Sequence, residues 1–238
     1  IYFASSYCTS LDTDGMNTNP LDCAKKKLNE IIISKSVSEL INLHQLAWVN
    51  TWNNGRIEII GNLNLALSIN ASMYFILSSI RSDWPQGLSP GGLASNGYNG
   101  HTFWDMDTWM YPPLLMLQPE LGKSCLQYRL DRRKEAKDKA QRFSFDGYMF
   151  PWECAHSGEE VCGTSYGNVW QWGAQEHHIT GDIAFAAIQY IQLTSDIKFL
   201  TTDVYDLLSN IADYWVSHVT LSKIDQKYHI YNVMGPDE

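Results

Sequence analysis

The stretch IAFAAIQYIQL, residues 183–193, is followed closely by VYDLLSNIADYWVSHV, residues 204–219. The first stretch is almost wholly apolar, which predicts a helix buried on most of its sides. The second stretch has apolar residues at helical spacing on one face only, which predicts a helix with one solvated side. A buried helix followed by a half-exposed one is the pattern that two concentric layers of helices produce, as in an α/α toroid.

The same alternation extends to the rest of the chain. Residues 63–79 form a second largely apolar helical stretch, and residues 120–142 predict a helix whose charged face, with Arg129 and Arg132, we expect to be solvated. Only residues 228–234 alternate as a strand does. A plain helical bundle would not need the long loops between these stretches. We therefore predict an all-α fold of the α/α toroid class.

Composition limits the classes of partner. The chain has 238 residues, 45% of them hydrophobic, and a net charge of −9. This charge argues against nucleic acids and anionic membranes as partners, because both attract basic surfaces. The longest apolar run is broken by polar residues and does not predict a membrane span. No secretory signal is visible, so a soluble protein is expected, whether cytoplasmic, lysosomal or secreted, and oligomeric state stays open, with a homodimer as an option.

Cysteines and histidines predict neither a metal nor a cofactor. Five cysteines are too few and odd in number for a disulfide framework. Cys154 and Cys162 could close one loop, although we favour free thiols. The adjacent His177 and His178 would point about 100° apart on a helix, so they do not form a metal pair. Fingerprints of nucleotide-binding loops and of serine hydrolases are absent from the sequence.

Tryptophans gather in or beside the predicted loops. Core packing explains most single tryptophans, but six near loops make a ligand site an equally good explanation. A sugar ring suits such a site, since its apolar C–H faces stack on indoles while carboxylates accept its hydroxyl hydrogens. The six are Trp84, Trp104, Trp109, Trp152, Trp170 and Trp172.

Glycosidic bond cleavage also needs two carboxyl roles. One carboxyl protonates the leaving oxygen, and the other attacks the sugar carbon or activates a water. The proton donor must keep its proton near neutral pH, so burial or a nearby negative charge must raise its pKa. Glu238, next to Asp237 in the segment GPDE, is a candidate donor. On spacing alone, a turn with solvated acids is the more common explanation of this segment.

Five sequence blocks occur together and in order, and together they resemble glycoside hydrolase family 65. Any one block is weak evidence, but the ordered set is specific, and the resemblance extends from about Trp48 to the last residue. The blocks are GLSPGGL (87–93), GYNGHTFWDMDTWMYPPLLM (97–116), GYMFPWECAHSGEE (147–160), QEHHITGDIA (175–184) and VMGPDE (233–238).

The resemblance implies a fold and an inverting reaction. The family's catalytic domain is an (α/α)6 barrel that follows a β-sandwich and a helical linker. It implies that residues 1–62 are an N-terminal segment and helical linker, and that residues 63–238 are about the first half of the barrel. On this basis the chain is expected to be a fragment, without the downstream glutamate that serves as general base in the family's hydrolases.

The resemblance also implies roles for site residues. Glu238 corresponds to the general acid, and Asp105 to the aspartate that binds hydroxyls of the nonreducing glucose. Trp152 and Glu153 would hold the same ring. Trp104 and His101 lie in the Asp105 loop and would line the pocket.

Three functions remain open at the level of sequence. The second aspartate, Asp107, and the block GLSPGGL resemble the trehalase and glucosidase members of the family. This resemblance favours an inverting hydrolase of an α-glucoside, either a trehalose-like disaccharide or glucosylgalactosyl-hydroxylysine. Asp107 could equally cap a helix start. A disaccharide phosphorylase that releases β-glucose 1-phosphate is the first alternative. A sugar-binding remnant without catalysis is the second.

Overall fold

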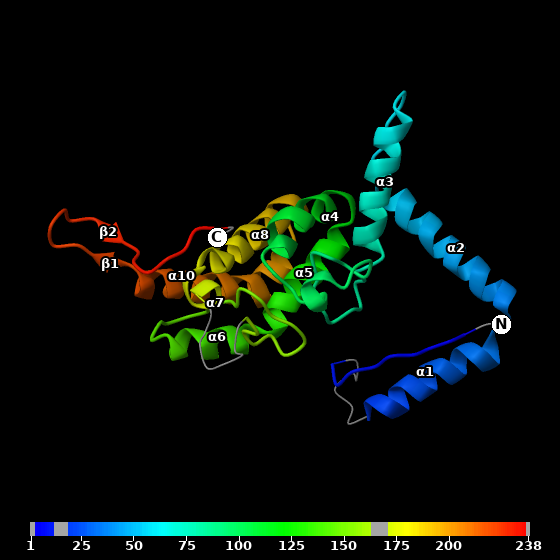
Figure 1. Cartoon of the computed structure of the whole chain (residues 1–238), viewed down its shortest axis with the longest axis horizontal. Helices are drawn as coiled ribbons and strands as arrows, with labels where there is room; N and C mark the ends of the chain where they lie inside the picture. The colour runs from blue at the N-terminus through cyan, green and yellow to red at the C-terminus, as the bar shows by residue number, and fades with distance from the viewer. Residues whose placement is uncertain (1–2, 12–18, 163–170, 237–238) are drawn as a thin grey trace. The chain divides into compact units, whose positions relative to one another are not determined.

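The computed structural model describes residues 3–11, 19–162 and 171–236, with the backbone alone at Gln171 (Figure 1). The chain divides into two compact units, Ile1–Ile57 and Glu58–Glu238. Each unit has its own internal packing and is described by itself.

The first unit contains two helices with well-defined starts. Helix α1 spans Pro20–Ser34, and the Asn19 side chain accepts the Leu21 N–H at its start. Helix α2 spans Val37–Asn54 and begins with a capping box, in which Ser36 and Glu39 satisfy each other's backbone N–H groups.

A disulfide joins Cys8 to Cys23 of α1 in this unit. The pairing considered from the sequence is wrong, because Cys154 and Cys162 are both free and buried. Cys154 instead forms a backbone bridge with Thr102. The short separation of Cys154 and Cys162 in the sequence therefore did not indicate which cysteines are bonded.

Helix α3, Leu63–Leu77, confirms the helix expected over residues 63–79 but not its burial. Only Met73 and Leu77 of this helix are buried, while side chains such as Leu67 and Phe75 are largely exposed. The described part of the chain therefore leaves most of the apolar side chains of α3 uncovered.

Helices α5 (Pro119–Asp131), α8 (His178–Thr194) and α10 (Tyr205–His218) form the centre of the second unit, and α8 packs against both of the others (Figure 1). The buried face of α8 includes Ile179, Ile183 and Tyr190, at helical spacing. Its other side exposes Phe185 and Ile188. The helix expected over residues 183–193 is confirmed, but it is buried on one face rather than on most sides.

The helix expected over residues 120–142 is two helices, because Arg132 leaves helical geometry between α5 and α6 (Arg133–Arg142). The expectation that Arg129 and Arg132 are solvated is wrong, since both side chains are buried. Arg132 donates to the Pro85 and His156 carbonyl oxygens, so it holds two loops against α5. The positions of charged residues in a sequence do not show that an arginine will bond to backbone carbonyl oxygens of distant loops.

The remaining elements are short. They are η1 (Gly97–Gly100), α4 (Tyr111–Leu117), α7 (Gln171–Gln175), α9 (Ile197–Phe199), the π-helical turns η2 (Met106–Met110) and η3 (Leu200–Val204), and the strands β1 (Thr220–Leu221) and β2 (Tyr228–His229). The two strands pair antiparallel in a hairpin, so the strand expected over residues 228–234 is present but shorter. In the ranges that the structure describes, these are the only strands of a sheet, and the all-α prediction is confirmed. No helix in the same ranges is long and apolar enough to cross a bilayer.

Candidate active site

Two of the sequence blocks, separated by about fifty residues, meet side by side in the second unit. The Thr102 N–H donates to the Cys154 carbonyl oxygen at 2.7 Å, and the Cys154 N–H donates to the Thr102 carbonyl oxygen at 3.0 Å. This antiparallel bridge places His101 beside Glu153, with 2.7 Å between His101 Nδ1 and Glu153 Oε1. Both side chains are mostly buried. Two of the predicted sugar-binding residues are thus in direct contact.

Aromatic rings lie on both of the segments that form this contact. The Trp152 ring stacks on the Trp172 ring at 5.9 Å and meets the Phe103 ring edge-on at 5.1 Å. The Trp104 ring lies 5.0 Å from the His178 imidazole. Trp109, which also contacts Trp104, is 66% exposed. Phe103, by contrast, is buried. The rings of the Asp105 loop therefore divide between core packing and solvent-facing positions.

A buried ion pair supports the loop that carries Trp104 and Asp105. Arg129 Nη2 donates to Asp107 Oδ2 at 2.5 Å and to the Phe103 carbonyl oxygen at 3.2 Å, and Arg129 Nε donates to Asp107 Oδ1. The Arg129 and Asp107 side chains are each 1% exposed. Asp107 lies inside η2 rather than at its start, and both of its carboxylate oxygens accept from Arg129, so the capping role considered for it is wrong. Asp105 itself is half-buried and immediately precedes η2.

A histidine between two carboxylates lies next to Trp104, and sequence reasoning assigned it no role. His178 Nδ1 is 2.6 Å from Asp182 Oδ2, and His178 Nε2 is 3.1 Å from Glu176 Oε2. Burial lowers the pKa of this imidazole, but the two carboxylates outweigh burial and raise the pKa of His178 above its usual value. The four-residue spacing of His178 and Asp182 on a helix was the available signal.

The predicted general acid, Glu238, lies outside the described residues. The chain just before it is held in place, because the Met234 N–H donates to the Gln175 carbonyl oxygen at 2.9 Å. Next to this contact, His177 Nδ1 is hydrogen-bonded to the Tyr214 hydroxyl of α10. Burial, helped by His218 and Lys139, lowers the pKa of His177 to about 4. The segment before α8 therefore anchors the loop that leads to Glu238.

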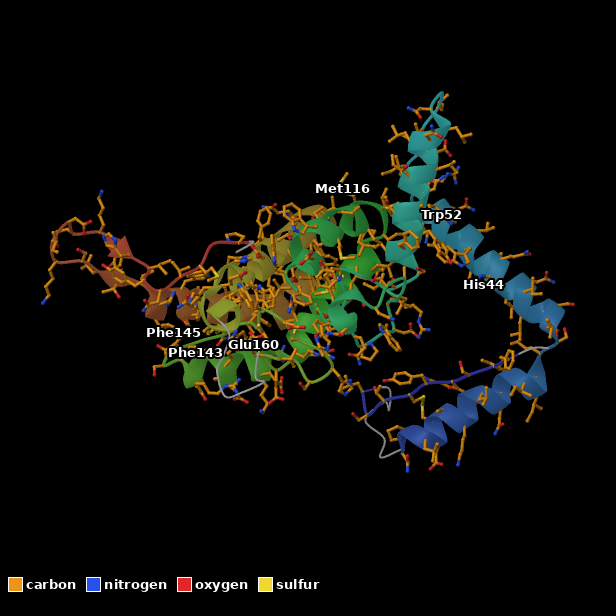
Figure 2. The ribbon with its side chains drawn as sticks, in the orientation of Figure 1. His44, Trp52, Met116, Phe143, Phe145 and Glu160 are labelled. Carbon is orange, nitrogen blue, oxygen red and sulfur yellow. A yellow bond between two sulfur atoms is a disulfide. The ribbon has the colours of Figure 1, made fainter. Side chains whose placement is uncertain are left out.

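A cavity of about 280 Å³ lies at this anchor. Its lining is aromatic and includes Phe143 and Phe145, labelled in Figure 2, together with His177, His218 and Tyr231. The Phe145 ring meets the His218 ring edge-on at 4.5 Å. In the described ranges, no group of three or more His, Cys, Asp or Glu side chains is arranged to hold a metal ion.

The structure thus brings His101 into direct contact with Glu153, the residue that follows Trp152. Trp104 lies on the same loop as His101, beside His178, and the Phe103 ring links this loop to Trp152. The sequence indicated Trp172 only as one of six tryptophans near loops, and its stacking on Trp152 is visible only in the fold. Sequence reasoning did not identify His178 as a neighbour of the site.

Comparison with known proteins gives a family match over most of the chain. The model of the glycosyl hydrolase family 65 central catalytic domain matches residues 72–238. A protein-glucosylgalactosylhydroxylysine glucosidase from Dictyostelium discoideum is 41% identical over 241 residues, which cover 100% of this chain and 32% of that protein. A kojibiose hydrolase from Flavobacterium johnsoniae is 40% identical over 202 residues, 84% of this chain and 29% of that protein.

One solved structure extends the comparison to the fold. A human-microbiome protein assigned as a kojibiose phosphorylase, an (α/α)6 barrel enzyme, is 25% identical and superimposes with a TM-score of 0.83. The match covers 93% of this chain and 30% of that one. It confirms the expected α/α toroid class. The chain spans about a third of the length of the relatives it matches.

Proposed function

Because the chain belongs to glycosyl hydrolase family 65, we propose that its full-length gene product is an inverting glycoside hydrolase that acts on an α-glucoside. Residues 63–238 would supply part of the (α/α)6 catalytic barrel, and residues 1–62 an N-terminal segment and helical linker. The contact of His101 with Glu153 beside the Trp152 ring is the observation that carries the proposal. The His101 and Glu153 side chains offer polar groups to sugar hydroxyls, and the Trp152 indole offers an apolar face to the C–H side of the sugar ring.

In this proposal, Glu238 is the general acid that protonates the departing glycosidic oxygen. Asp105 and Glu153 accept hydrogen bonds from hydroxyls of the nonreducing glucosyl unit, and His101 orients the Glu153 carboxylate. Trp152 and Trp104 supply apolar surface and exclude water, which strengthens each polar contact. The general base would activate the attacking water from the opposite face of the sugar. The described residues offer no assignment for that base.

Two kinds of α-glucoside follow from the relatives' names. Glucosylgalactosyl-hydroxylysine is the substrate named for the Dictyostelium protein, and kojibiose is the one named for the Flavobacterium protein. We place hydrolysis of such a glucoside ahead of trehalose cleavage. No metal or cofactor has a role in this reaction scheme, and the carbohydrate is the partner.

The proposal is tested by the stereochemistry of the first product. The full-length gene product is incubated with kojibiose, glucosylgalactosyl-hydroxylysine or trehalose, and the anomeric protons are followed by NMR before mutarotation. Glucosylgalactosyl-hydroxylysine releases a single glucose, and inversion predicts that it first appears as β-glucose. Trehalose and kojibiose also release a second glucose as the leaving group, so for them the β-glucose in excess of that leaving glucose is followed. α-Glucose as the first product from glucosylgalactosyl-hydroxylysine would contradict an inverting mechanism.

A phosphorylase is the second candidate, favoured by the structural similarity to the human-microbiome protein. In that case phosphate replaces water as the nucleophile, and inversion yields β-glucose 1-phosphate. The same assay separates the two candidates when phosphate is omitted. Turnover that persists without phosphate supports the hydrolase, and turnover that requires phosphate supports the phosphorylase.

A further inference from the structure

Glu160 lies behind the Trp152–Glu153 pair and is bonded to the backbone of both residues. Glu160 Oε2 accepts the Trp152 N–H at 2.8 Å, and Oε1 accepts the Glu153 N–H at 3.0 Å. Oε1 also accepts the Cys162 N–H at 3.2 Å. The carboxylate is almost fully buried, within the second unit (Figure 2). One side chain therefore fixes two adjacent peptide groups of the candidate sugar site.

Lys139 of α6 completes the arrangement from the other side. Its Nζ donates to Glu160 Oε2 at 2.7 Å, and the Lys139 side chain is 2% exposed. A buried carboxylate is costly unless a cation and hydrogen-bond donors surround it. Here one ammonium and three backbone N–H groups do so, and bonds to an ionised acceptor are stronger than neutral ones.

The same carboxylate also lies against the backbone next to Trp172. A Cβ atom at Gly173 would lie 3.1 Å from Glu160 Cδ, so a side chain at this position would require the Glu160 carboxyl group to shift. Trp172, the residue before Gly173, stacks on Trp152. Glu160 thus contacts the main chain that supports both stacked rings.

We propose that Glu160 is a positioning residue of the sugar site, whose carboxylate fixes the peptide groups of Trp152 and Glu153 and thereby the direction of their side chains. The proposal rests on the proposed function for its effect on catalysis. Glu160 does not touch the sugar. It acts through the two residues that do, and Lys139 supplies the cation that a buried carboxylate needs. A displacement of about 1 Å in binding groups can lower a rate by roughly 10²-fold.

A purely structural explanation is that Glu160 only neutralises the buried charge of Lys139. Two variants of the full-length gene product separate the explanations. Glu160→Gln loses the ionised acceptor and leaves Lys139 unpaired. The double variant Lys139→Met with Glu160→Gln also removes the unpaired charge. Glu159→Gln, at the exposed neighbouring position, is the matched control.

The two explanations predict different results for kcat/KM and for the melting temperature. If Glu160 positions the pair, the double variant regains melting temperature relative to Glu160→Gln, but its kcat/KM stays roughly 10- to 100-fold below wild type. If Glu160 only neutralises Lys139, the double variant regains both, which overturns the proposal. Glu159→Gln should match wild type in both measurements.

Glu160→Asp serves if the double variant does not fold. It keeps the negative charge for Lys139, but the shorter side chain cannot reach the ammonium and both amides together. We expect kcat/KM to fall in this variant as well. Wild-type kcat/KM in Glu160→Asp would overturn the proposal.

Hydrogen–deuterium exchange tests the positioning step without any turnover. At least one of the Trp152 and Glu153 amides should exchange about 10-fold faster in Glu160→Gln than in wild type or in Glu159→Gln, because glutamine keeps only one of the two acceptor oxygens. Unchanged exchange would overturn the proposal even in a fully active enzyme. Faster exchange in a protein that cleaves no glucoside would instead count against the proposed function alone.

Discussion

Replacing Arg129 by methionine tests the buried ion pair beneath the Asp105 loop. The change leaves the Asp107 carboxylate 1% exposed and without the cation that now bonds both of its oxygens. Breaking a buried pair in this way costs about 3–5 kcal/mol of unfolding free energy. The Phe103 carbonyl oxygen also loses its partner, which accounts for about 1–3 kcal/mol where no water replaces it. Together the two contributions predict a total loss of about 4–8 kcal/mol.

The double variant Asp107→Leu with Arg129→Met isolates the charge effect. Replacing a whole buried pair by apolar groups of similar volume is often neutral. We therefore expect the double variant to lose only about 1–2 kcal/mol, chiefly from the Phe103 carbonyl. Arg133→Met is the control, because Arg133 forms only a half-exposed pair with Asp206 at 3.9 Å. Its loss should cost less than about 1 kcal/mol.

The assay is guanidinium chloride unfolding of the full-length gene product, followed by tryptophan fluorescence. Equal slopes among variants allow midpoint shifts to be compared as free energies. A loss below about 1 kcal/mol in Arg129→Met would refute the assignment of a buried, structurally required pair. A double variant less stable than Arg129→Met would refute the argument that the unpaired carboxylate causes the loss.

Four further predictions concern the site and the first unit. Glu238→Gln should lower kcat by about 10²–10⁴-fold with little change in substrate affinity, because an amide cannot donate the required proton; retained turnover would remove Glu238 from the acid role. Asp105→Ala should lower kcat/KM on the order of 10²–10⁴-fold by removing a hydroxyl contact, and an unchanged kcat/KM would make Asp105 only structural. His177 has its pKa lowered by burial from 6.5 to about 4, so the unfolded chain takes up a proton first; stability should fall by on the order of 2 kcal/mol as pH decreases from 6.5 to 4, and His177→Gln should flatten melting temperature against pH in this range. The bond between Cys8 and Cys23 predicts that both resist alkylation after unfolding without reductant, and labelling of either by mass spectrometry would contradict it.

Helices were predictable from sequence because apolar periodicity is local. The spacing that identifies α8 and α10 is contained in each stretch, and the turn residues that bound them lie nearby. Burial was harder to predict, since it depends on what the rest of the chain covers. Helix α3 shows the difference, with an apolar sequence and largely exposed side chains.

Only those residues of the candidate site that lie in the family's motifs could be predicted from the sequence. The family's motifs indicated Trp152 and Glu153, but nothing local showed that a bridge between Thr102 and Cys154 would bring them to His101. The burial of Arg129 was likewise hidden, because its partner Asp107 lies on another element, 22 residues earlier. Contacts between elements are set by packing, which a single sequence does not display.

The central claim is that one glucosyl ring lies between Asp105, Trp152 and the Glu238 carboxyl. A crystal structure of the full-length gene product with an uncleaved α-glucoside bound to the Glu238→Gln variant tests it most directly. We predict that the ring stacks against Trp152, that Asp105 accepts a hydroxyl hydrogen, and that the residue 238 amide lies about 2.6–3.2 Å from the glycosidic oxygen. A sugar bound elsewhere, or residue 238 on the outer surface, would contradict the account.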